Sequence, residues 1–355
     1  MKKVLIIVLS TLVLLIVGIV TFYKLNLRAV SSSSIEIEFV VPESSTYYGI
    51  IPKLKSEGLI RNELCFKIYL KLNSHNELQA GTYKLNKNMS VKKIVDTFNK
   101  GNNYNPNEIS ITFKEGKNMR YIAKTISENT NNSEEDVFNL LNDKDYLNEL
   151  ISTYWFLDNS ILNNDIYYSL EGYLYPETYR FTNKDVTVKE IFKTMLDEME
   201  KKLLPYKSDI ESSKYSVHEI LTLASIVELE GKKVEDRKDV AGVFYNRLNS
   251  KMNLGSDVTT YYAAKVDMSE RDLYKTEVDS VNAYNTRSAT MAGKLPVGPI
   301  CNPSIESIEA TIKPAKNDYY YFVADKNGKT YFTKTYSEHL AKVNELKQAG
   351  LWYTY

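Results

Sequence analysis

S-V-H-E-I-L-T-L-A-S-I-V-E-L-E-G, from Ser216 to Gly231, is the segment around which we expect the rest of the chain to pack. Ser216 and Glu219 form a capping box that starts a helix, and Gly231 is typical of the left-handed residue that ends one. At about 100° per residue, apolar side chains line one face of this helix and Glu228 stands at the edge of that face. Glu230 falls on the opposite side, where we expect it to be solvated.

Glu228 is the first candidate for chemistry. Burial and the negative end of the helix dipole both favour the protonated form of a carboxyl group, which is the form that a general acid needs. The alternative is a structural role, in which Arg237 or Arg247 neutralises a buried carboxylate. The helix pattern alone leaves both interpretations open.

Composition excludes several classes of function. The chain has 355 residues, with 45 Lys and Arg against 45 Asp and Glu. A net charge of zero gives no electrostatic basis for a nucleic-acid partner. The histidines are scattered, and Cys65 and Cys301 allow at most one disulfide, so we expect no metal site. The length allows two or three domains.

An apolar run from Val4 to Tyr23 is long enough to span a bilayer. It is longer than the apolar core of a typical signal peptide, and residues 29–31 (A-V-S) form a poor cleavage site. We therefore predict a permanent anchor, with a cleaved signal peptide as the alternative. Lys2 and Lys3 favour a cytoplasmic tail at residues 1–3, and the larger part of the chain would then lie outside the membrane.

The remaining chain divides by pattern and composition. Residues 24–34 form a linker, and residues 35–103 combine strands and helices in a small α+β module. A second linker covers residues 104–107, and residues 108–345 form a larger domain of helices and short strands. Because the βαβ spacing of a doubly wound sheet does not repeat, the sequence predicts an α+β fold.

Local signals place further elements. Capping boxes begin helices at Ser133 and at Thr187, and a second helix follows the central one at about Val234 to Leu248. Asp325 to Gly328 (D-K-N-G) is typical of a hairpin turn between two strands.

Seven separated blocks carry a resemblance to a known family. They are L-E-G-Y-L-Y-P-E-T-Y (170–179), L-A-S-I-V-E-L-E (223–230), V-A-G-V-F-Y-N-R-L (240–248), L-G-S-D (254–257), A-Y-N-T (283–286), L-P-V-G-P-I-C-N-P (295–303) and Y-Y-F-V-A-D-K-N-G-K-T-Y-F (320–332). In this order they resemble the endolytic murein transglycosylases, the YceG-like lytic transglycosylases. The apolar run and the 35–103 module also resemble the membrane segment and the LysM-like subdomain of that family.

The resemblance implies a function. Members are anchored outside the cytoplasmic membrane and cut the MurNAc–GlcNAc bond inside nascent peptidoglycan glycan strands, leaving 1,6-anhydro-MurNAc ends. The chain would then trim strands or terminate their elongation, with peptidoglycan synthases or a division or elongation complex as partners and no cofactor. The catalytic glutamate of the family lies in the A-S-I-V-E block, which places it at Glu228.

Six further residues are candidates for contact with the glycan. Each also has a structural alternative. The alternative is turn formation for Tyr284, Asn285 and Thr286, helix capping for Ser256 and Asp257, and fixation of its own loop for Glu171. The candidates are Ser256, Asp257, Tyr284, Asn285, Thr286 and Glu171.

The sequence departs from the family pattern on loops around the expected cleft. These departures bear on substrate contacts and glycan preference more than on Glu228. They are Gly255 (for Gln), Val258 (for Pro), Arg287 (for Tyr), Val297 (for Pro) and Ser304 (for Gly).

Two other functions remain open. One is a hydrolytic muramidase on the same polymer, which would use Glu228 with Asp257 or Glu171, because hydrolysis needs a second carboxylate. The other is a wall-binding scaffold without catalytic activity, in which the 35–103 module grips the glycan.

Overall fold

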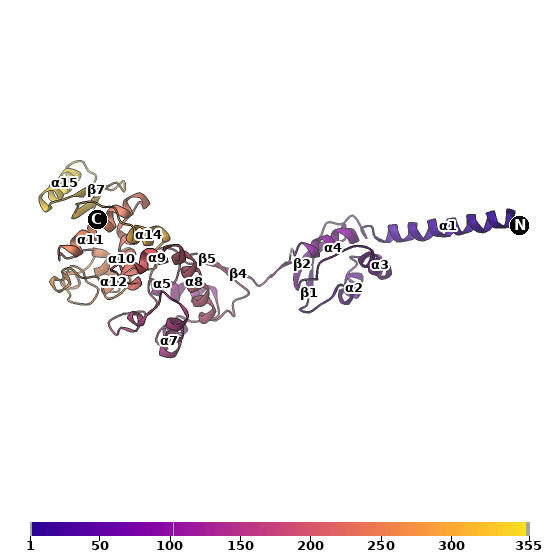
Figure 1. Cartoon of the computed structure of the whole chain (residues 1–355), viewed down its shortest axis with the longest axis horizontal. Coiled ribbons are helices and arrows are strands. Elements are labelled where there is room, and N and C mark those ends of the chain that lie inside the picture. Colours follow the sequence, from indigo (N-terminus) through magenta and orange to yellow (C-terminus); the bar gives the residue numbers. More distant parts are fainter. Residues whose placement is uncertain (1, 102, 353–355) are drawn as a thin grey trace. The chain divides into compact units, whose positions relative to one another are not determined.

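The computed structural model describes residues 2–101 and 103–352, and the chain divides between Glu108 and Ile109 into two compact units (Figure 1). Unit 1 contains a long helix followed by a small module, and unit 2 contains helices and two short antiparallel strand pairs. The predicted α+β class is confirmed. The LysM-like character of the module stays a prediction.

Helix α1 (Lys2–Asn26) contains the predicted apolar run. Within it, Lys3–Asn26 is long and apolar enough to cross a membrane, and its side chains are exposed except for those of Tyr23 and Asn26, which are partly buried. Length and composition are also those of a signal sequence, so the choice between anchor and signal rests on the sequence arguments above.

The rest of unit 1 is a small sheet covered by helices. The elements are β1 (Glu36–Val41), α2 (Tyr47–Ser56), α3 (Glu63–Leu72), β2 (Gly81–Asn86), α4 (Val91–Asn99) and β3 (Asn103–Tyr104). Strand β2 lies between β1 and β3, and both pairs are antiparallel. Tyr104 therefore belongs to the sheet, although the sequence placed it in a linker. Phe39, Phe66 and Tyr83 lie in the closed core of this module.

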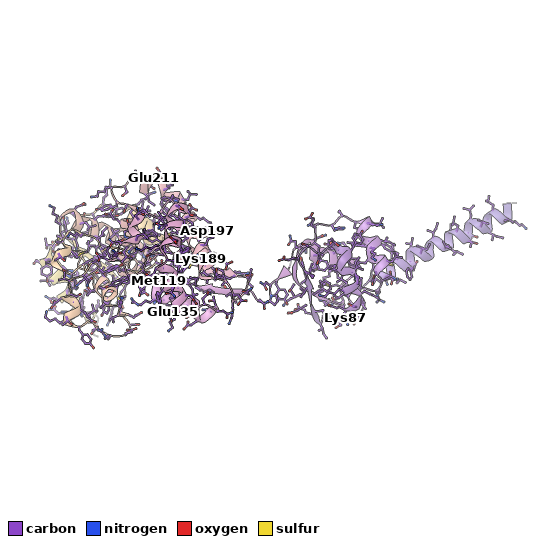
Figure 2. All side chains as sticks on the ribbon, turned by 90° about the horizontal axis from the view of Figure 1, so that it is seen from below. Lys87, Met119, Glu135, Lys189, Asp197 and Glu211 are labelled. Atoms are coloured by element: carbon purple, nitrogen blue, oxygen red, sulfur yellow. The ribbon has the colours of Figure 1, made fainter. Side chains whose placement is uncertain are left out.

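Unit 2 begins with β4 (Ile109–Thr112), which pairs with β5 (Thr178–Phe181), and ends with the hairpin of β6 (Tyr321–Ala324) and β7 (Thr330–Thr333). The hairpin turn is the predicted one, with Gly328 at φ 76°. Figure 2 shows Glu211 at the periphery of this unit and Met119, which is fully buried, among its packed side chains.

The helices of unit 2 occupy the sequence between and after these strands. They are α5 (Met119–Asn129), α6 (Glu134–Leu141), α7 (Lys144–Thr153), α8 (Val188–Leu203), α9 (Lys207–Glu211), α10 (Val217–Glu230), α11 (Arg237–Asn249), α12 (Asp257–Ala263), α13 (Lys275–Val278), α14 (Ile305–Ile312) and α15 (Tyr336–Gln348), with short 3-10 turns η1 (Asn159–Leu162), η2 (Leu204–Tyr206), η3 (Val234–Asp236) and η4 (Ala289–Met291).

Helix α10 is the predicted central helix, and it is shared by two hydrophobic cores. Leu221 and Ala224 pack into the core built on α5 to α8, whereas Leu223 and Val227 pack into the core built on α11 and α12. The capping box of Ser216 is present. Because both sides of the helix are buried, its last turn is held rigidly where the two cores meet.

The end of α10 differs from the prediction. Gly231 has φ −80°, so it is not a left-handed residue. Glycine is needed here for another reason: a Cβ atom at this position would lie 2.7 Å from Cγ of Arg237. The second predicted helix is also divided, because its first residues form η3 and the α-helix begins at Arg237.

Candidate active site

The carboxyl group of Glu228 lies in the last turn of α10, and its side chain is only 7% exposed. Oε1 is 3.1 Å from Nη2 of Arg237, at the start of α11. Oε2 accepts hydrogen bonds from the backbone N–H of Ser304, at 3.0 Å, and from the hydroxyl group of the same residue. Ser304 is the N-cap of α14, so three helices converge on this one carboxyl group.

Arg237 and the end of α14 supply positive charge to Glu228. A guanidinium group and a helix N-terminus both stabilise an ionised carboxylate, which opposes the effects of burial and of the α10 dipole. Arg237 is therefore the arginine that neutralises the buried carboxylate in the alternative, structural role of Glu228. Arg247 lies elsewhere and donates to the backbone carbonyl groups of Tyr320 and Leu254. An ion pair is compatible with catalysis, because the same contacts stabilise the carboxylate that forms when an acid gives up its proton.

Gly116 brings the backbone close to Glu228. Its φ of 68° is a conformation that favours glycine, and a Cβ atom here would lie 3.5 Å from Cγ of Glu228. Gly116 also lines a pocket of about 140 Å³, together with Leu229, the residue that follows Glu228 in α10. Glu228 itself does not line the pocket, but it lies next to Gly116 and Leu229, which do.

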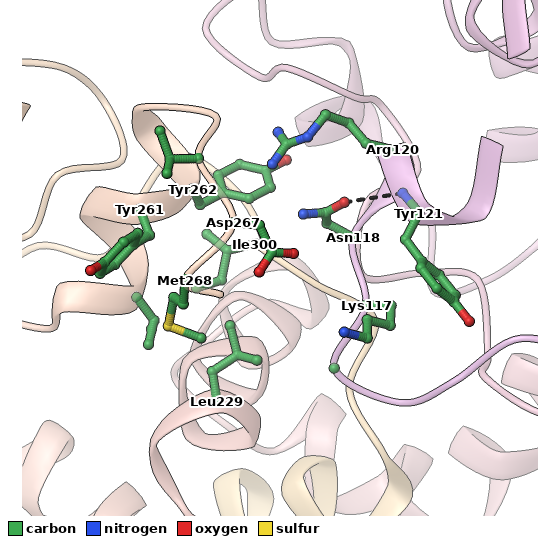
Figure 3. A pocket seen from close by; sticks show the side chains of 13 residues that line it. Lys117, Asn118, Arg120, Tyr121, Leu229, Tyr261, Tyr262, Asp267, Met268 and Ile300 are labelled. Carbon is green, nitrogen blue, oxygen red and sulfur yellow. Dashed lines mark hydrogen bonds between the residues drawn. The ribbon is translucent and has the colours of Figure 1, made fainter. Parts of the chain in front are cut away.

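The pocket has two walls of different chemistry (Figure 3). One wall is the start of α5, with Lys117, Asn118 and Arg120, and the other is the end of α12 and the loop that follows it, including Tyr262 and Asp267. Polar groups that alternate with aromatic and apolar side chains suit a sugar, which has hydroxyl groups on its edges and an apolar face.

Arg120 is the most distinctive group in this pocket. Its guanidinium group lies over the ring of Tyr262, 5.9 Å from the centroid. Its Nη1 atom is buried and has no hydrogen-bond partner among the residues that the structure describes. A buried donor without a partner costs free energy, so a ligand with acceptor oxygens would be favoured here.

Glu171 is buried, with 1% exposure, and holds three segments together. Oε2 accepts hydrogen bonds from the backbone N–H of Met119 at 2.9 Å and from the hydroxyl group of Tyr262 at 3.0 Å, and Oε1 accepts one from Asn302 at 3.3 Å. Burial raises the pKa of Glu171 to about 7. Its position behind the pocket supports the walls and leaves no exposed surface for direct contact with a ligand.

Four more of the predicted contact residues are also buried, and they form one network. Ser256 is the N-cap residue of α12, but its hydroxyl group makes no capping bond and donates to Glu230 at 2.6 Å. Its N–H donates to Oγ1 of Thr286 at 3.0 Å. Asn285 accepts a hydrogen bond from Thr260 at 2.8 Å, and the hydroxyl group of Tyr284 accepts one from the backbone N–H of Tyr167 at 3.2 Å. The geometry gives this network the role of fixing the 284–286 loop against α12.

Asp257 is the one exposed member of the predicted set, and it forms an ion pair with Arg287. This pair joins two positions on the rim of the loop network, one of them a departure from the family pattern. Substrate contact by these six residues stays a prediction, and Asp257 is the member whose exposure permits it directly.

Glu230 corrects one expectation. It is partly buried and bonded to Ser256, whereas the helix pattern placed it on a solvated face. Burial raises its pKa, and the nearby carboxylate of Asp257 raises it further. The α12 segment covers this side of α10, which periodicity alone could not show.

Glu115 is an acid that the sequence analysis missed. Partial desolvation of its carboxyl group raises its pKa, and the neighbouring carboxylates of Glu228 and Glu306 raise it further. The residue itself is exposed, next to Gly116. It is therefore a second carboxyl group within electrostatic reach of Glu228. Within residues 2–101 and 103–352, no three His, Cys, Asp or Glu side chains come together in a way that could hold a metal ion.

The sequence contained weak signals for the pocket. Asn118 caps α5, as its place before an apolar helix suggests, but no spacing connects Arg120 with Tyr262 or with Leu229, which lie far away in the chain. Ser304 stood out only as a departure from the family pattern.

Comparison with known proteins gives consistent matches. The sequence model of the YceG-like family matches residues 39–345. A protein of Bacillus subtilis (strain 168) named endolytic murein transglycosylase is 37% identical over 329 residues, 92% of this chain and 89% of that protein. A protein of the same name from Streptococcus pneumoniae serotype 2 (strain D39) is 35% identical, and the match covers 86% of this chain and 57% of that protein. The crystal structure of a yceG-like protein from Listeria monocytogenes superposes with a TM-score of 0.61 at 33% identity, over 87% of this chain and 100% of that chain.

Proposed function

This chain belongs to the YceG-like family, and from that premise we propose that it is a lytic transglycosylase that acts on peptidoglycan. The observation that carries the proposal is the position of Glu228, which is held between Arg237 and Ser304 and lies next to Gly116 of the pocket. Its relatives from B. subtilis and S. pneumoniae are named endolytic murein transglycosylases.

In the proposed reaction, Glu228 acts twice. In protonated form it donates its proton to the glycosidic oxygen while the C1–O bond of MurNAc breaks. The resulting carboxylate then takes the proton of the C6 hydroxyl group as O6 attacks C1, which gives the 1,6-anhydro end and regenerates the acid. One carboxyl group completes the cycle, and no water molecule is consumed.

The surroundings of Glu228 suit this cycle. The guanidinium group of Arg237 and the two donors of Ser304 stabilise the carboxylate that exists between the two proton transfers. The pocket beside it would hold a sugar ring, with Arg120 and Asn118 on hydroxyl or acetamido oxygens and Tyr262 in the apolar contact.

A hydrolytic muramidase is the second candidate, and Glu115 is the observation that favours it. A retaining or inverting hydrolase needs a second carboxyl group near the acid, and Glu115 lies within electrostatic reach of Glu228. Glu171 fits this role less well, because it is fully buried behind the pocket wall.

The cellular setting is part of the proposal. Helix α1 would anchor the chain in the cell membrane by a single pass, with both the module and the catalytic unit outside the cytoplasm. There the enzyme would cut MurNAc–GlcNAc bonds in nascent strands and so trim or terminate them, beside peptidoglycan synthases or a division or elongation complex.

Mass spectrometry of the glycan products tests this function. We expect purified peptidoglycan incubated with the protein to yield ends that carry 1,6-anhydro-MurNAc, and Glu228→Gln to lose about 10²–10⁴-fold in rate. Glu219→Gln is the matched control on the same helix, because Gln also completes the capping box of Ser216. Reducing MurNAc ends would instead establish the hydrolase, and equal activity of Glu228→Gln and wild type would exclude Glu228 as the acid.

A further inference from the structure

Helix α3 carries an exposed apolar stripe. Leu64, Ile68 and Leu72 stand at intervals of four residues and are 63%, 37% and 70% exposed. Residues spaced in this way lie on one side of a helix. The opposite side of α3 is buried at Phe66 and Leu70, and Cys65, at one border of the stripe, is buried as well. The module therefore covers one face of α3, and the apolar stripe on the other face is exposed.

Lysines border the stripe. Lys71 is exposed, and Lys67 is partly exposed and lies 4.0 Å from Glu63 in a loose ion pair. A helix with apolar side chains on one face and lysines beside them is typical of a segment that lies in the surface of a membrane. The lysine ammonium groups would reach the lipid headgroups while their methylene chains stay near the apolar stripe.

The start of α3 is tied to the segment that leaves α1. Arg61, which precedes the N-cap of α3, donates to the backbone carbonyl groups of Ala29 and Val30 at 2.7–3.0 Å. The carbonyl group of Leu27 accepts a hydrogen bond from the N–H of Val91 in α4, at 3.0 Å. These contacts fix the module against the residues that directly follow Asn26, the last residue of α1.

Chain length then limits how far α3 can be from a membrane that contains α1. From Asn26 to Ala29 an extended chain spans about 10 Å at most. Lys3–Asn26 has 24 residues, and at 1.5 Å per residue this makes about 36 Å, against a hydrocarbon core of about 30 Å. The end of α1 thus reaches the headgroup layer, and the short connection through Ala29 and Arg61 keeps the first turn of α3 close to that layer.

We propose that α3 is a membrane-surface helix: its stripe of Leu64, Ile68 and Leu72 inserts into the headgroup–acyl boundary of the same leaflet from which α1 emerges. The proposal rests on the membrane anchor proposed above. Lys24 and Arg28, both exposed at the end of α1, add positive charge at the same level. The stripe therefore matches a leaflet that contains anionic phospholipids, and the module is held on the membrane surface instead of swinging from a flexible stalk.

Site-specific fluorescence in vesicles tests the proposal. The full-length protein is reconstituted into vesicles of phosphatidylcholine and phosphatidylglycerol, with an environment-sensitive dye on Leu72→Cys. The native thiols of Cys65 and Cys301 are buried, and burial raises the pKa of both, so the reagent labels the introduced thiol. The dye is then exposed to two quenchers, a lipid with a spin label near its headgroup and iodide in the water.

Val40→Cys is the matched control. Val40 is an apolar residue of the same module and is 47% exposed. Val40 pairs with Thr82, near the start of β2. The segment that follows α1 contacts the other end of this strand, where the N–H of Ser31 donates to the carbonyl group of Lys87 at 3.0 Å. Five residues of strand separate these two ends, which is about 17 Å.

We expect the lipid quencher to act on the dye at Leu72 and iodide to act on the dye at Val40. The control for anchoring is an alkaline carbonate wash, after which the chain must stay in the vesicles. If it stays and iodide alone quenches both dyes, the inference is overturned, and the stripe is then a surface for a protein partner. Loss of the chain in that wash would instead show that α1 is not an anchor, and so overturn the premise. A dye at Leu64→Cys gives an independent position in case labelling at Leu72 disturbs the helix end.

Discussion

Ser304 donates two hydrogen bonds to a single oxygen of Glu228, one from its backbone N–H at 3.0 Å and one from its hydroxyl group. The same hydroxyl group accepts a hydrogen bond from Nη1 of Arg237 at 2.6 Å, so it bridges the ion pair. The family pattern has glycine at this position, which could supply the backbone N–H but no hydroxyl bridge. In this chain, a departure from the pattern makes direct contact with the proposed catalytic group.

We expect Ser304→Ala to lower the free energy of unfolding by about 1–2 kcal/mol, because it leaves a buried charged donor without its acceptor. We also expect kcat to fall roughly tenfold, since about 1.4 kcal/mol of stabilisation of the carboxylate is lost. Ser307→Ala is the matched control: Ser307 is buried in the same helix, and its hydroxyl group has no partner among the described residues. Equal kinetic losses in both variants would show that Ser304 acts only through the packing of α14.

The ion pair of Arg237 with Glu228 predicts strong coupling. Arg237→Met leaves a carboxylate that is 7% exposed without its counter-charge, which should cost about 3–5 kcal/mol of stability. In a Glu228→Gln background the same change should cost less, with a coupling energy of about 1–3 kcal/mol in a double-mutant cycle measured by urea unfolding.

Lys238→Met provides the control for that cycle. Lys238 is the next residue in α11, and its ion pair with Glu309 is exposed on both sides, so its loss should cost less than about 1 kcal/mol. Additive costs for Arg237→Met and Glu228→Gln would contradict a direct electrostatic link between the two side chains.

Elements with local signals could be predicted from the sequence. The capping boxes of Ser133, Thr187 and Ser216 all start helices, because a side chain satisfies a backbone N–H three residues away whatever the rest of the fold does. The hairpin turn that ends at Gly328 is local in the same way. The position of Glu228 at the end of a buried helix followed from the same helix pattern.

Features that depend on distant segments could not be predicted. Arg237 of α11 approaches the end of α10 at Gly231, and Ser256 at the start of α12 covers Glu230. Neither residue belongs to α10, so the helix pattern of α10 could not show these contacts. The Y-N-T block had two open interpretations, contact with the glycan or turn formation, and Tyr284 and Asn285 are buried in the structure, where Tyr167 and Thr260 bond to them. Polar residues in a loop can serve a ligand or the loop itself, and the sequence does not distinguish the two.

Glu171 predicts a pH dependence of stability. Its pKa is about 7 in the folded chain, against about 4.3 for an unperturbed Glu. At a pH between these two pKa values, Glu171 keeps its proton in the folded state and has lost it in the unfolded state. Its contribution to the free energy of unfolding is therefore complete below about pH 4.3 and disappears as the pH rises through about 7. The total is at most about 4 kcal/mol.

We therefore expect the stability of wild type to fall relative to Glu171→Gln between pH 5 and pH 8, since Gln remains neutral throughout. Urea unfolding followed by tryptophan fluorescence measures this in unit 2, because Trp155 and Trp352, the only two tryptophans, both lie in that unit. Parallel pH curves for the two proteins would mean that the carboxyl group of Glu171 is ionised across the range.

Arg120 predicts a role in substrate binding. Its Nη1 atom is buried in the pocket wall without a partner among the described residues, and Leu229 of the same pocket is next to Glu228 in the chain. We expect Arg120→Met to raise KM for peptidoglycan roughly tenfold, the worth of one hydrogen bond to a charged group, with little change in kcat. Lys124→Met on the same helix is the control, because its side chain is 64% exposed. A fall in kcat at constant KM would place Arg120 in the reaction itself, and identical kinetics of the two variants would remove the pocket from substrate binding.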